Sequence, residues 1–224
     1  METTTIDLRD ASLSEGATKL AEAFEKLSAG ATQYFLSKDN PRSLIRELVS
    51  THWGLFDWAL LESDASGFLA SIRKREQSGP LSLSELMGSD HRRCDELFAQ
   101  AEQAAQAGDL EQATKLNGQY ALGMEHHFGM EEEGFFAEFD RRMGMTGGGP
   151  VAVMREEHQQ IRGMLHRMEE ALNQSDLEDY LGAADTMLYL MEQHNMKEEQ
   201  MLYPMADDAF GADMEELLKR LFVY

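Results

Sequence analysis

The spacing of hydrophobic positions changes near residue 80 and divides the chain into two parts. Before that point, short alternating or aromatic-rich runs predict strands, and two stretches with helical spacing lie between them. The expected elements, in order, are a strand at 5–9, a helix at 16–27, a strand at 32–36, a helix opened by Pro41, and strands at 56–61 and 68–73. This βαβαββ order predicts an α+β two-layer sandwich over residues 1–78.

The second part, residues 79–224, begins in the turn-forming stretch Gln77-Ser78-Gly79-Pro80 and then shows only helical periodicity. Capping residues and prolines predict four long helices, which start near Ser82 or Ser84, at Asp109, at Pro150 and at Asp176. The fourth should end near Tyr203-Pro204, and an amphipathic tail helix at 213–222 should pack on the other four. This pattern predicts an all-α, up-down four-helix bundle with a short C-terminal helix.

The predicted second and fourth helices each carry a histidine followed by a glutamate four residues later. The two pairs are His127 with Glu131, and His194 with Glu198. On an α-helix, positions i and i+4 lie on one face about 5–6 Å apart at Cβ, so both side chains can reach one metal ion. The two glutamates are separated along the sequence by the same interval as the two histidines, and we call this interval the repeat offset.

Two single histidines, His91 and His158, are also separated by the repeat offset. His91 therefore precedes His127 by as many residues as His158 precedes His194. A helical hairpin that turns midway brings such residues back to one level, at ~1.5 Å per residue. Two hairpins packed together would then direct four imidazoles and two carboxylates into one interior. The spacing predicts a two-metal site formed by His91, His127, Glu131, His158, His194 and Glu198.

An alternative interpretation makes these six residues hydrogen-bonded core histidines and surface glutamates. A single inward histidine would favour that alternative, because histidine is intermediate in burial. Six such residues in register favour metal, since burying two carboxylates without cations is very costly. Mixed imidazole and carboxylate ligands suit iron, manganese or zinc, whereas magnesium and calcium bind mostly oxygen.

The formal net charge of −21 lies mostly beyond residue 78. Such a surface repels nucleic acid and anionic lipid, so we expect no nucleic-acid partner and no membrane partner. The sequence has no long apolar run and no signal-peptide pattern at its start, which predicts a cytoplasmic protein. Cys94, the single cysteine, is expected to be a small buried hydrophobe rather than a redox-sensitive thiol.

The order His, HxxxE, His, HxxxE over about residues 80–205, together with Asp90-His91-Arg92, His127-Phe128 and Glu131-Glu132, resembles the hemerythrin-like (HHE) metal-binding family. The resemblance implies a non-haem di-iron centre with an oxo or hydroxo bridge, and manganese or zinc as alternative metals. It makes the four histidines terminal ligands and the two glutamates bridging ligands. Open positions on the metals would accept a small diatomic molecule or peroxide.

The chain departs from the oxygen-carrying hemerythrins at two places. Those proteins have a fifth histidine four residues after the one on the third helix, and an HxxxxD pattern on the fourth. This chain has Arg162 and HxxxE instead. Its pattern more closely resembles hemerythrin-like proteins of iron-centre repair and nitric-oxide responses, but it lacks the double-cysteine segment of the repair proteins. We expect Arg162 to face solvent or form an ion pair, and His126 and His166 to be surface or supporting groups.

In residues 1–78, Asp7-Leu8-Arg9, Asp39-Asn40-Pro41-Arg42-Ser43-Leu44 and Phe56-Asp57-Trp58 resemble a little-characterised domain family with the two-layer fold of the TusA-like sulfur carriers. Sulfur carriers of that fold have a cysteine beside a proline after the first strand. This chain has Ala11-Ser12-Leu13-Ser14 there, so sulfur transfer is not expected.

The predicted function is that of a di-iron protein that binds or reduces O2, NO or peroxide as a sensor, store or detoxifier. Two alternatives stay open: a redox-signalling module whose residues 1–78 recognise a protein partner, and an iron-donating repair protein. The sequence leaves enzymatic activity and homo-oligomer formation undecided.

Overall fold

The computed structural model of the chain describes residues 5–76, 81–145 and 148–224. Contacts between residues divide the chain into two compact units, one of Met1–Leu81 with Lys219–Tyr224 and the other of Ser82–Leu218. The expected boundary at Gln77-Ser78-Gly79-Pro80 lies outside the described residues. The tail was expected to pack on the bundle, but its last residues belong to the first unit.

The first unit contains a mixed four-stranded sheet in the order β1-β2-β4-β3. Strand β1 (Ile6–Asp7) runs parallel to β2 (Thr32–Ser37). Strand β4 (Gly67–Lys74) pairs antiparallel with both β2 and β3 (Phe56–Asp64). The predicted βαβαββ order is confirmed, although β1 is shorter than the expected strand at 5–9.

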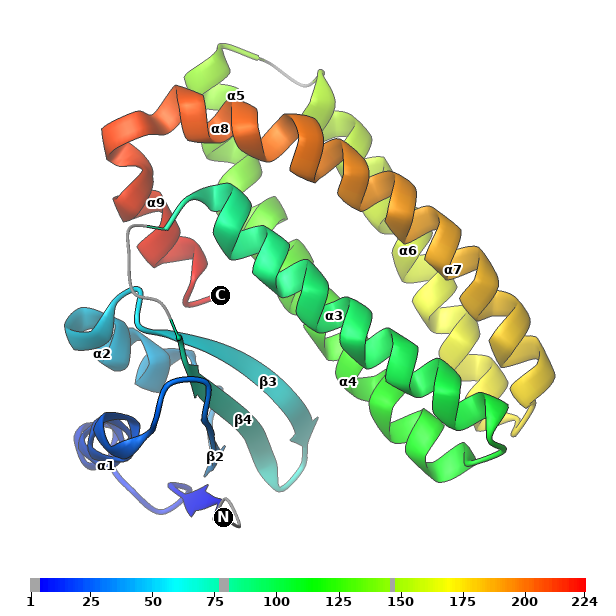
Figure 1. The fold of residues 1–224 in the computed structure, drawn as a ribbon, viewed down its shortest axis with the longest axis horizontal. Coiled ribbons are helices and arrows are strands. Elements are labelled where there is room, and N and C mark those ends of the chain that lie inside the picture. The colour runs from blue at the N-terminus through cyan, green and yellow to red at the C-terminus, as the bar shows by residue number, and fades with distance from the viewer. Residues whose placement is uncertain (1–4, 77–80, 146–147) are drawn as a thin grey trace. The chain divides into compact units, whose positions relative to one another are not determined.

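Two helices, α1 (Leu13–Lys26) and α2 (Arg42–His52), lie next to each other on one side of this sheet (Figure 1). Ser12 and Glu15 form a capping box at the start of α1, in which each side chain accepts a hydrogen bond from the other residue's amide. The buried apolar side chains of this unit include Leu20, Phe24, Phe35, Ile45, Leu48, Phe56, Ala70 and Ile72.

The C-terminal tail joins this unit through aromatic contacts. Helix α9 (Met214–Leu221) leads into Phe222, whose ring meets the rings of Trp53 and Phe56 edge-on at centroid distances of 5.5 and 5.1 Å. The Trp58 indole N–H also donates a hydrogen bond to the Phe222 carbonyl oxygen. Edge-to-face aromatic pairs of this kind stabilise by about 0.5–1.5 kcal/mol each beyond the area they bury, which explains the changed assignment of the tail.

The second unit is a four-helix bundle, in which long helices run side by side (Figure 1). Each of them contacts two others, in the cyclic order α3 (Leu83–Gln106), α4 (Leu110–Gly129), α6 (Pro150–Asn173) and α7 (Leu177–Lys197). The predicted bundle is therefore confirmed. No helix in the described ranges is both long and apolar enough to cross a membrane. Starts of the four helices agree with the sequence signals, at Ser82, Asp109, Pro150 and Asp176.

Helices α4 and α7 continue through π-helical turns instead of ending. One turn, Met130–Phe135, joins α4 to α5 (Phe136–Met143), and the other, Glu198–Leu202, joins α7 to α8 (Tyr203–Phe210). The expected end of the fourth helix at Tyr203-Pro204 is therefore wrong. Pro204 lies in the first turn of α8, directly after the π-helical turn, and proline is common at the first positions of a helix. Each π-helical turn contains the glutamate of one HxxxE motif, and such turns are frequent at functional sites.

Gly67, at the start of β4, occupies a position that tolerates no side chain. Its φ is 127°, and a Cβ atom would lie 2.4 Å from the Ser37 carbonyl oxygen. We expect Gly67→Ala to lower the free energy of unfolding of the first unit by about 2 kcal/mol, in the range of such backbone strain. Both tryptophans, Trp53 and Trp58, belong to this unit, so denaturant titration followed by tryptophan fluorescence measures the change. Gly118→Ala in α4 is the control, because a Cβ there meets nothing within 4 Å. An unchanged transition in Gly67→Ala would contradict this account.

Candidate metal centre

The structure brings the six predicted ligand residues together inside the bundle. Each long helix provides one histidine and each π-helical turn one glutamate, and none of them is more than 3% exposed. Their nitrogen and oxygen atoms form two groups suited to hold a metal ion, within 4.8 Å of one another in each group. We call them the His158/His194 subsite, formed by Glu131, His158, His194 and Glu198, and the His91/His127 subsite, formed by His91, His127 and Glu198.

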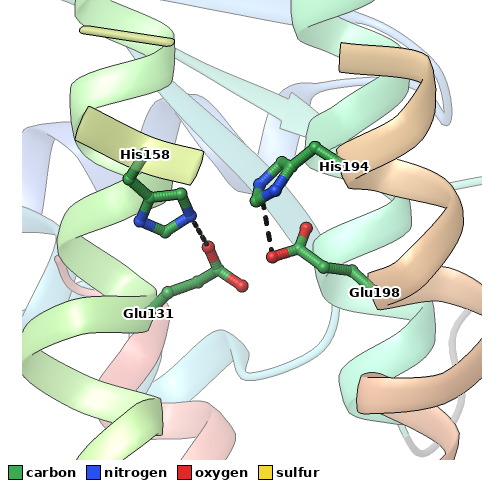
Figure 2. Close-up of side chains that lie close together, drawn as sticks. All are labelled: Glu131, His158, His194 and Glu198. Carbon is green, nitrogen blue, oxygen red and sulfur yellow. Dashed lines mark ion pairs between the residues drawn. The ribbon is translucent and has the colours of Figure 1, made fainter. Parts of the chain in front are cut away.

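The four side chains of the His158/His194 subsite point toward one another (Figure 2). His158 Nε2 lies 3.1 Å from Glu131 Oε2, and His194 Nε2 lies 3.3 Å from Glu198 Oε1. All four atoms are buried, yet none of them has a hydrogen-bond partner among the described residues. Since buried polar atoms are nearly always hydrogen-bonded, nitrogen and oxygen atoms that face one another at close range without forming hydrogen bonds fit a metal ion.

In the His91/His127 subsite, two imidazole nitrogens face each other. His91 Nε2 lies 3.1 Å from His127 Nε2 and 3.3 Å from Glu198 Oε2. His127 Nε2 lies 3.6 Å from Glu131 Oε2. Both glutamates thus reach toward both pairs of histidines, which is the position that carboxylates bridging two cations would occupy.

Acidic residues that precede two of the histidines support the histidines of neighbouring helices. Asp90 Oδ2 lies 3.1 Å from His127 Nδ1, and Glu157 Oε2 lies 3.1 Å from His194 Nδ1. The repeat offset separates these two acids, as it separates the histidines that they contact. A carboxylate that accepts a hydrogen bond from Nδ1–H leaves Nε2 free to bind a metal. It also makes the imidazole a stronger electron-pair donor toward that metal.

The two remaining histidines, His158 and His91, are also supported at Nδ1 by carboxylates. These belong to the glutamates that directly follow Glu131 and Glu198. Glu132 Oε1 lies 2.7 Å from His158 Nδ1, and Glu199 Oε1 lies 2.8 Å from His91 Nδ1. These two acids are again separated by the repeat offset. All four Nε2 atoms are therefore turned toward the interior by a carboxylate on the opposite ring nitrogen. The sequence analysis did not assign these supporting acids, although the repeat applies to them too.

Basic side chains pair with three of the supporting acids. Arg93 lies 2.7 Å from Asp90, Arg162 lies 2.8 Å from Glu132, and Lys197 pairs with Glu157. Burial alone would raise the pKa of the Asp90 carboxyl, but the Arg93 charge and the hydrogen bond with His127 hold it below its usual range. Arg162 is ion-paired as expected, and its contact with Glu132 links it to His158.

Tyr203 also reaches the centre, although the spacing of the sequence motifs did not point to it. Its hydroxyl lies 3.0 Å from Glu131 Oε1 and 2.9 Å from Glu198 Oε2. In an α-helix, residue i+5 points about 140° away from residue i, so Tyr203 was not expected to share a face with Glu198. The i→i+5 bonding of the π-helical turn brings the two onto the same face.

Comparison with known proteins places this bundle in a family. A family model described as the hemerythrin HHE cation binding domain matches residues 82–206, which is more than half of the chain. The chain belongs to this family. Neither the curated proteins nor the solved structures yielded a match. Because the hemerythrin match begins at residue 82, the TusA-like assignment of residues 1–78 stays a prediction.

The hemerythrin-like site holds protons that a metal would have to displace. Burial and the neighbouring charge of Glu198 raise the pKa of Glu131 to about 7. Burial opposes protonation of His91, but hydrogen bonds with Glu198 and Glu199 raise its pKa to about 10. Burial would also raise the pKa of Glu198, yet the electrostatic interaction with His194 and the hydrogen bond with His91 hold it below its usual range. At neutral pH the metal-free site therefore offsets carboxylate charge with protons.

Three other side chains singled out in the sequence lie outside the ligand groups. Cys94 is buried in an apolar cluster of the bundle, and burial raises the pKa of its thiol to about 12. His126 is partly exposed, and His166 is exposed and pairs with Glu170. The structure thus gives Cys94 the expected role of a buried hydrophobe.

The metal content of alanine variants should distinguish residues that bind metal from adjacent residues that do not. We expect His127→Ala and Glu131→Ala to lose at least one of the bound ions, since each removes a buried donor from the interior. His126→Ala is the matched control, because it removes the adjacent imidazole, which belongs to neither group of ligand atoms. Elemental analysis of iron-loaded, desalted proteins measures the difference. Equal loss in all three variants would show that the ligand assignment on α4 is wrong.

Metal affinity should rise with pH, because binding displaces protons from the site. Each displaced proton changes the dissociation constant about tenfold per pH unit. His91, with a pKa of about 10, loses a proton throughout the neutral range, and below pH 7 Glu131 must lose one as well. We therefore expect zinc affinity to increase from about pH 6 to pH 8, most steeply below pH 7. Competition with a chromophoric chelator measures it, and an affinity independent of pH would contradict the assigned proton positions.

Proposed function

We propose that the bundle holds two iron ions, one in each subsite, and that this centre binds or reacts with a small oxidant such as O2, NO or peroxide. The role would be sensing, storage or detoxification. The observation that supports it most directly is the group of four buried ligand atoms of the His158/His194 subsite, which have no hydrogen-bond partner among the described residues. Membership of the hemerythrin HHE cation-binding family supports cation binding independently.

The donor set favours iron, manganese or zinc over calcium or magnesium. Each ion would receive two imidazole nitrogens and carboxylate oxygens from Glu131 and Glu198. Such mixed ligands suit iron, and also manganese or zinc, whereas a calcium or magnesium site would have mostly oxygen ligands. Two bridging carboxylates also offset part of the charge of two nearby cations. Two imidazoles and two carboxylate oxygens leave further positions open on each ion.

The surroundings of the centre favour a small ligand. The six ligand residues are at most 3% exposed, so a large substrate has no access in this conformation. Two aromatic rings stack on His158, Phe128 at a centroid distance of 4.0 Å and Phe136 at 5.7 Å. A diatomic molecule or peroxide is small enough to enter such an apolar environment, which supports a ligand of that class.

Iron donation for cluster repair has less support. Chemistry of that kind would draw on reactive thiols, but the sequence contains one cysteine, Cys94. Its side chain is 2% exposed, and its raised pKa keeps the thiol protonated at neutral pH. Recognition of a protein partner by residues 1–78 stays a separate proposal, supported by the fact that this segment, together with Lys219–Tyr224, belongs to a compact unit distinct from the bundle.

Anaerobic loading with ferrous iron tests the proposed function. We expect two irons per chain and a new charge-transfer absorption when O2, NO or peroxide is added. A spectrum that returns when O2 is removed would indicate reversible binding, and a lasting change would indicate oxidation of the irons. Metal-free protein mixed with the same oxidants is the control. The proposal fails if the protein binds well below two irons, or if none of the three oxidants changes its spectrum.

A further inference from the structure

Tyr203 lies at the centre of the His91/His127 subsite. The residue is fully buried, and its ring lies 5.8 Å from the His91 ring. Its hydroxyl oxygen is 3.4 Å from His91 Nε2 and 3.5 Å from His127 Nε2, in addition to its contacts of 3.0 and 2.9 Å with the two ligand glutamates. Atoms of four ligand residues thus surround one phenolic oxygen.

The distances around this oxygen are those expected among ligands of one ion. Nitrogen and oxygen ligands lie about 2.0–2.2 Å from a metal such as zinc, so two ligands at right angles are roughly 3 Å apart. The Tyr203 hydroxyl meets all four neighbours at 2.9–3.5 Å. Two of these neighbours, His91 Nε2 and His127 Nε2, are themselves 3.1 Å apart. A hydroxyl that served only as a hydrogen-bond donor has one proton to give, and it would need only one of these contacts.

The second half of the repeat has no such oxygen. Phe136 precedes Tyr203 by the repeat offset, and each is the first residue after its π-helical turn. The Phe136 ring lies 5.7 Å from the His158 ring, much as the Tyr203 ring lies 5.8 Å from His91. The two rings therefore occupy equivalent places, and the phenolic hydroxyl is present on one side only.

We propose that Tyr203 is a phenolate ligand of the ion in the His91/His127 subsite, and that the ion in the His158/His194 subsite is the one that binds the small oxidant. This inference rests on the proposed two-iron function and gives its two ions different roles. On coordination, the phenol O–H bond breaks, the proton is released to solvent and the oxygen lone pair forms the bond to iron, so no change in oxidation state is needed. The extra ligand closes a position on one ion and leaves that position open on the other.

A phenolate ligand has a spectroscopic signature that does not depend on reactivity. Iron(III) bound to phenolate absorbs visible light by charge transfer, and excitation into that band enhances the ring vibrations in a resonance Raman spectrum. We would compare the ferric wild-type protein with Tyr203→Phe, which installs the residue that the chain itself has at the equivalent position. Iron content is measured on the same samples.

Tyr180→Phe is the matched control. Tyr180 is also fully buried, and it belongs to the apolar cluster of the bundle. It lies nearly four helical turns before His194 on α7, roughly 21 Å away at ~1.5 Å per residue. The variant removes a buried hydroxyl of the same unit without touching the centre, and circular dichroism checks that both variants stay folded.

We expect phenolate vibrations in the wild type and in Tyr180→Phe, and their complete loss in Tyr203→Phe. Two irons per chain without phenolate vibrations in the wild type would overturn the inference and leave the two-iron proposal intact. Phenolate vibrations that persist in Tyr203→Phe would overturn it as well. Phenolate vibrations with a single iron would support Tyr203 as a ligand and contradict the two-iron proposal. If Tyr203→Phe fails to fold, a two-iron wild-type protein without phenolate vibrations still overturns the inference.

Discussion

Two fully buried carboxylates, Glu131 and Glu198, require positive charge or protons close by, and the rest of the bundle is arranged to supply them. Each is 0% exposed, and an unpaired charge in such a place costs several kcal/mol. Four imidazoles surround the pair, and without metal the protons on His91 and Glu131 offset part of the negative charge. Cations can replace those protons. The fold can therefore keep both carboxylates buried without metal, and bound metal would offset their charge instead.

Support for the imidazoles extends outward in layers. A carboxylate on the Nδ1 side orients each ring, and basic residues pair with three of those carboxylates. The arrangement recurs at the repeat offset, so the two hairpins supply equivalent ligands and equivalent supporting acids. Tyr203 and Phe136 break the repeat next to the ligand atoms. A repeated site with one altered position can give its two metals different roles.

The sequence was informative where geometry restricts the residues strongly. A metal site on helices requires ligands four residues apart on one helix and at the same height along neighbouring helices. This constraint allowed His127 and Glu131 to be predicted as ligands from the sequence. Helix starts were readable for a similar reason, because capping residues such as Asp109 satisfy exposed amides. Glu132, Glu199 and Tyr203 lie in or directly after the π-helical turns, which change the helical periodicity. Asp90 and Glu157 lie on the regular helices α3 and α6, and their contacts with histidines of neighbouring helices depend on how the helices pack. Only the last residues of the tail, Lys219–Tyr224, were misplaced, because an amphipathic helix shows that it packs but not on which surface.

X-ray absorption of the iron-loaded protein tests the central claim most directly, because iron–iron scattering detects a second ion beside the first. If Glu131 and Glu198 bridge two metals, the spectrum should contain an iron neighbour at roughly 3.5–4 Å or closer, in addition to nitrogen and oxygen ligands. Its loss in Glu198→Ala would tie that neighbour to the buried carboxylates. A wild-type spectrum with light-atom ligands only, and no iron neighbour, would contradict the account.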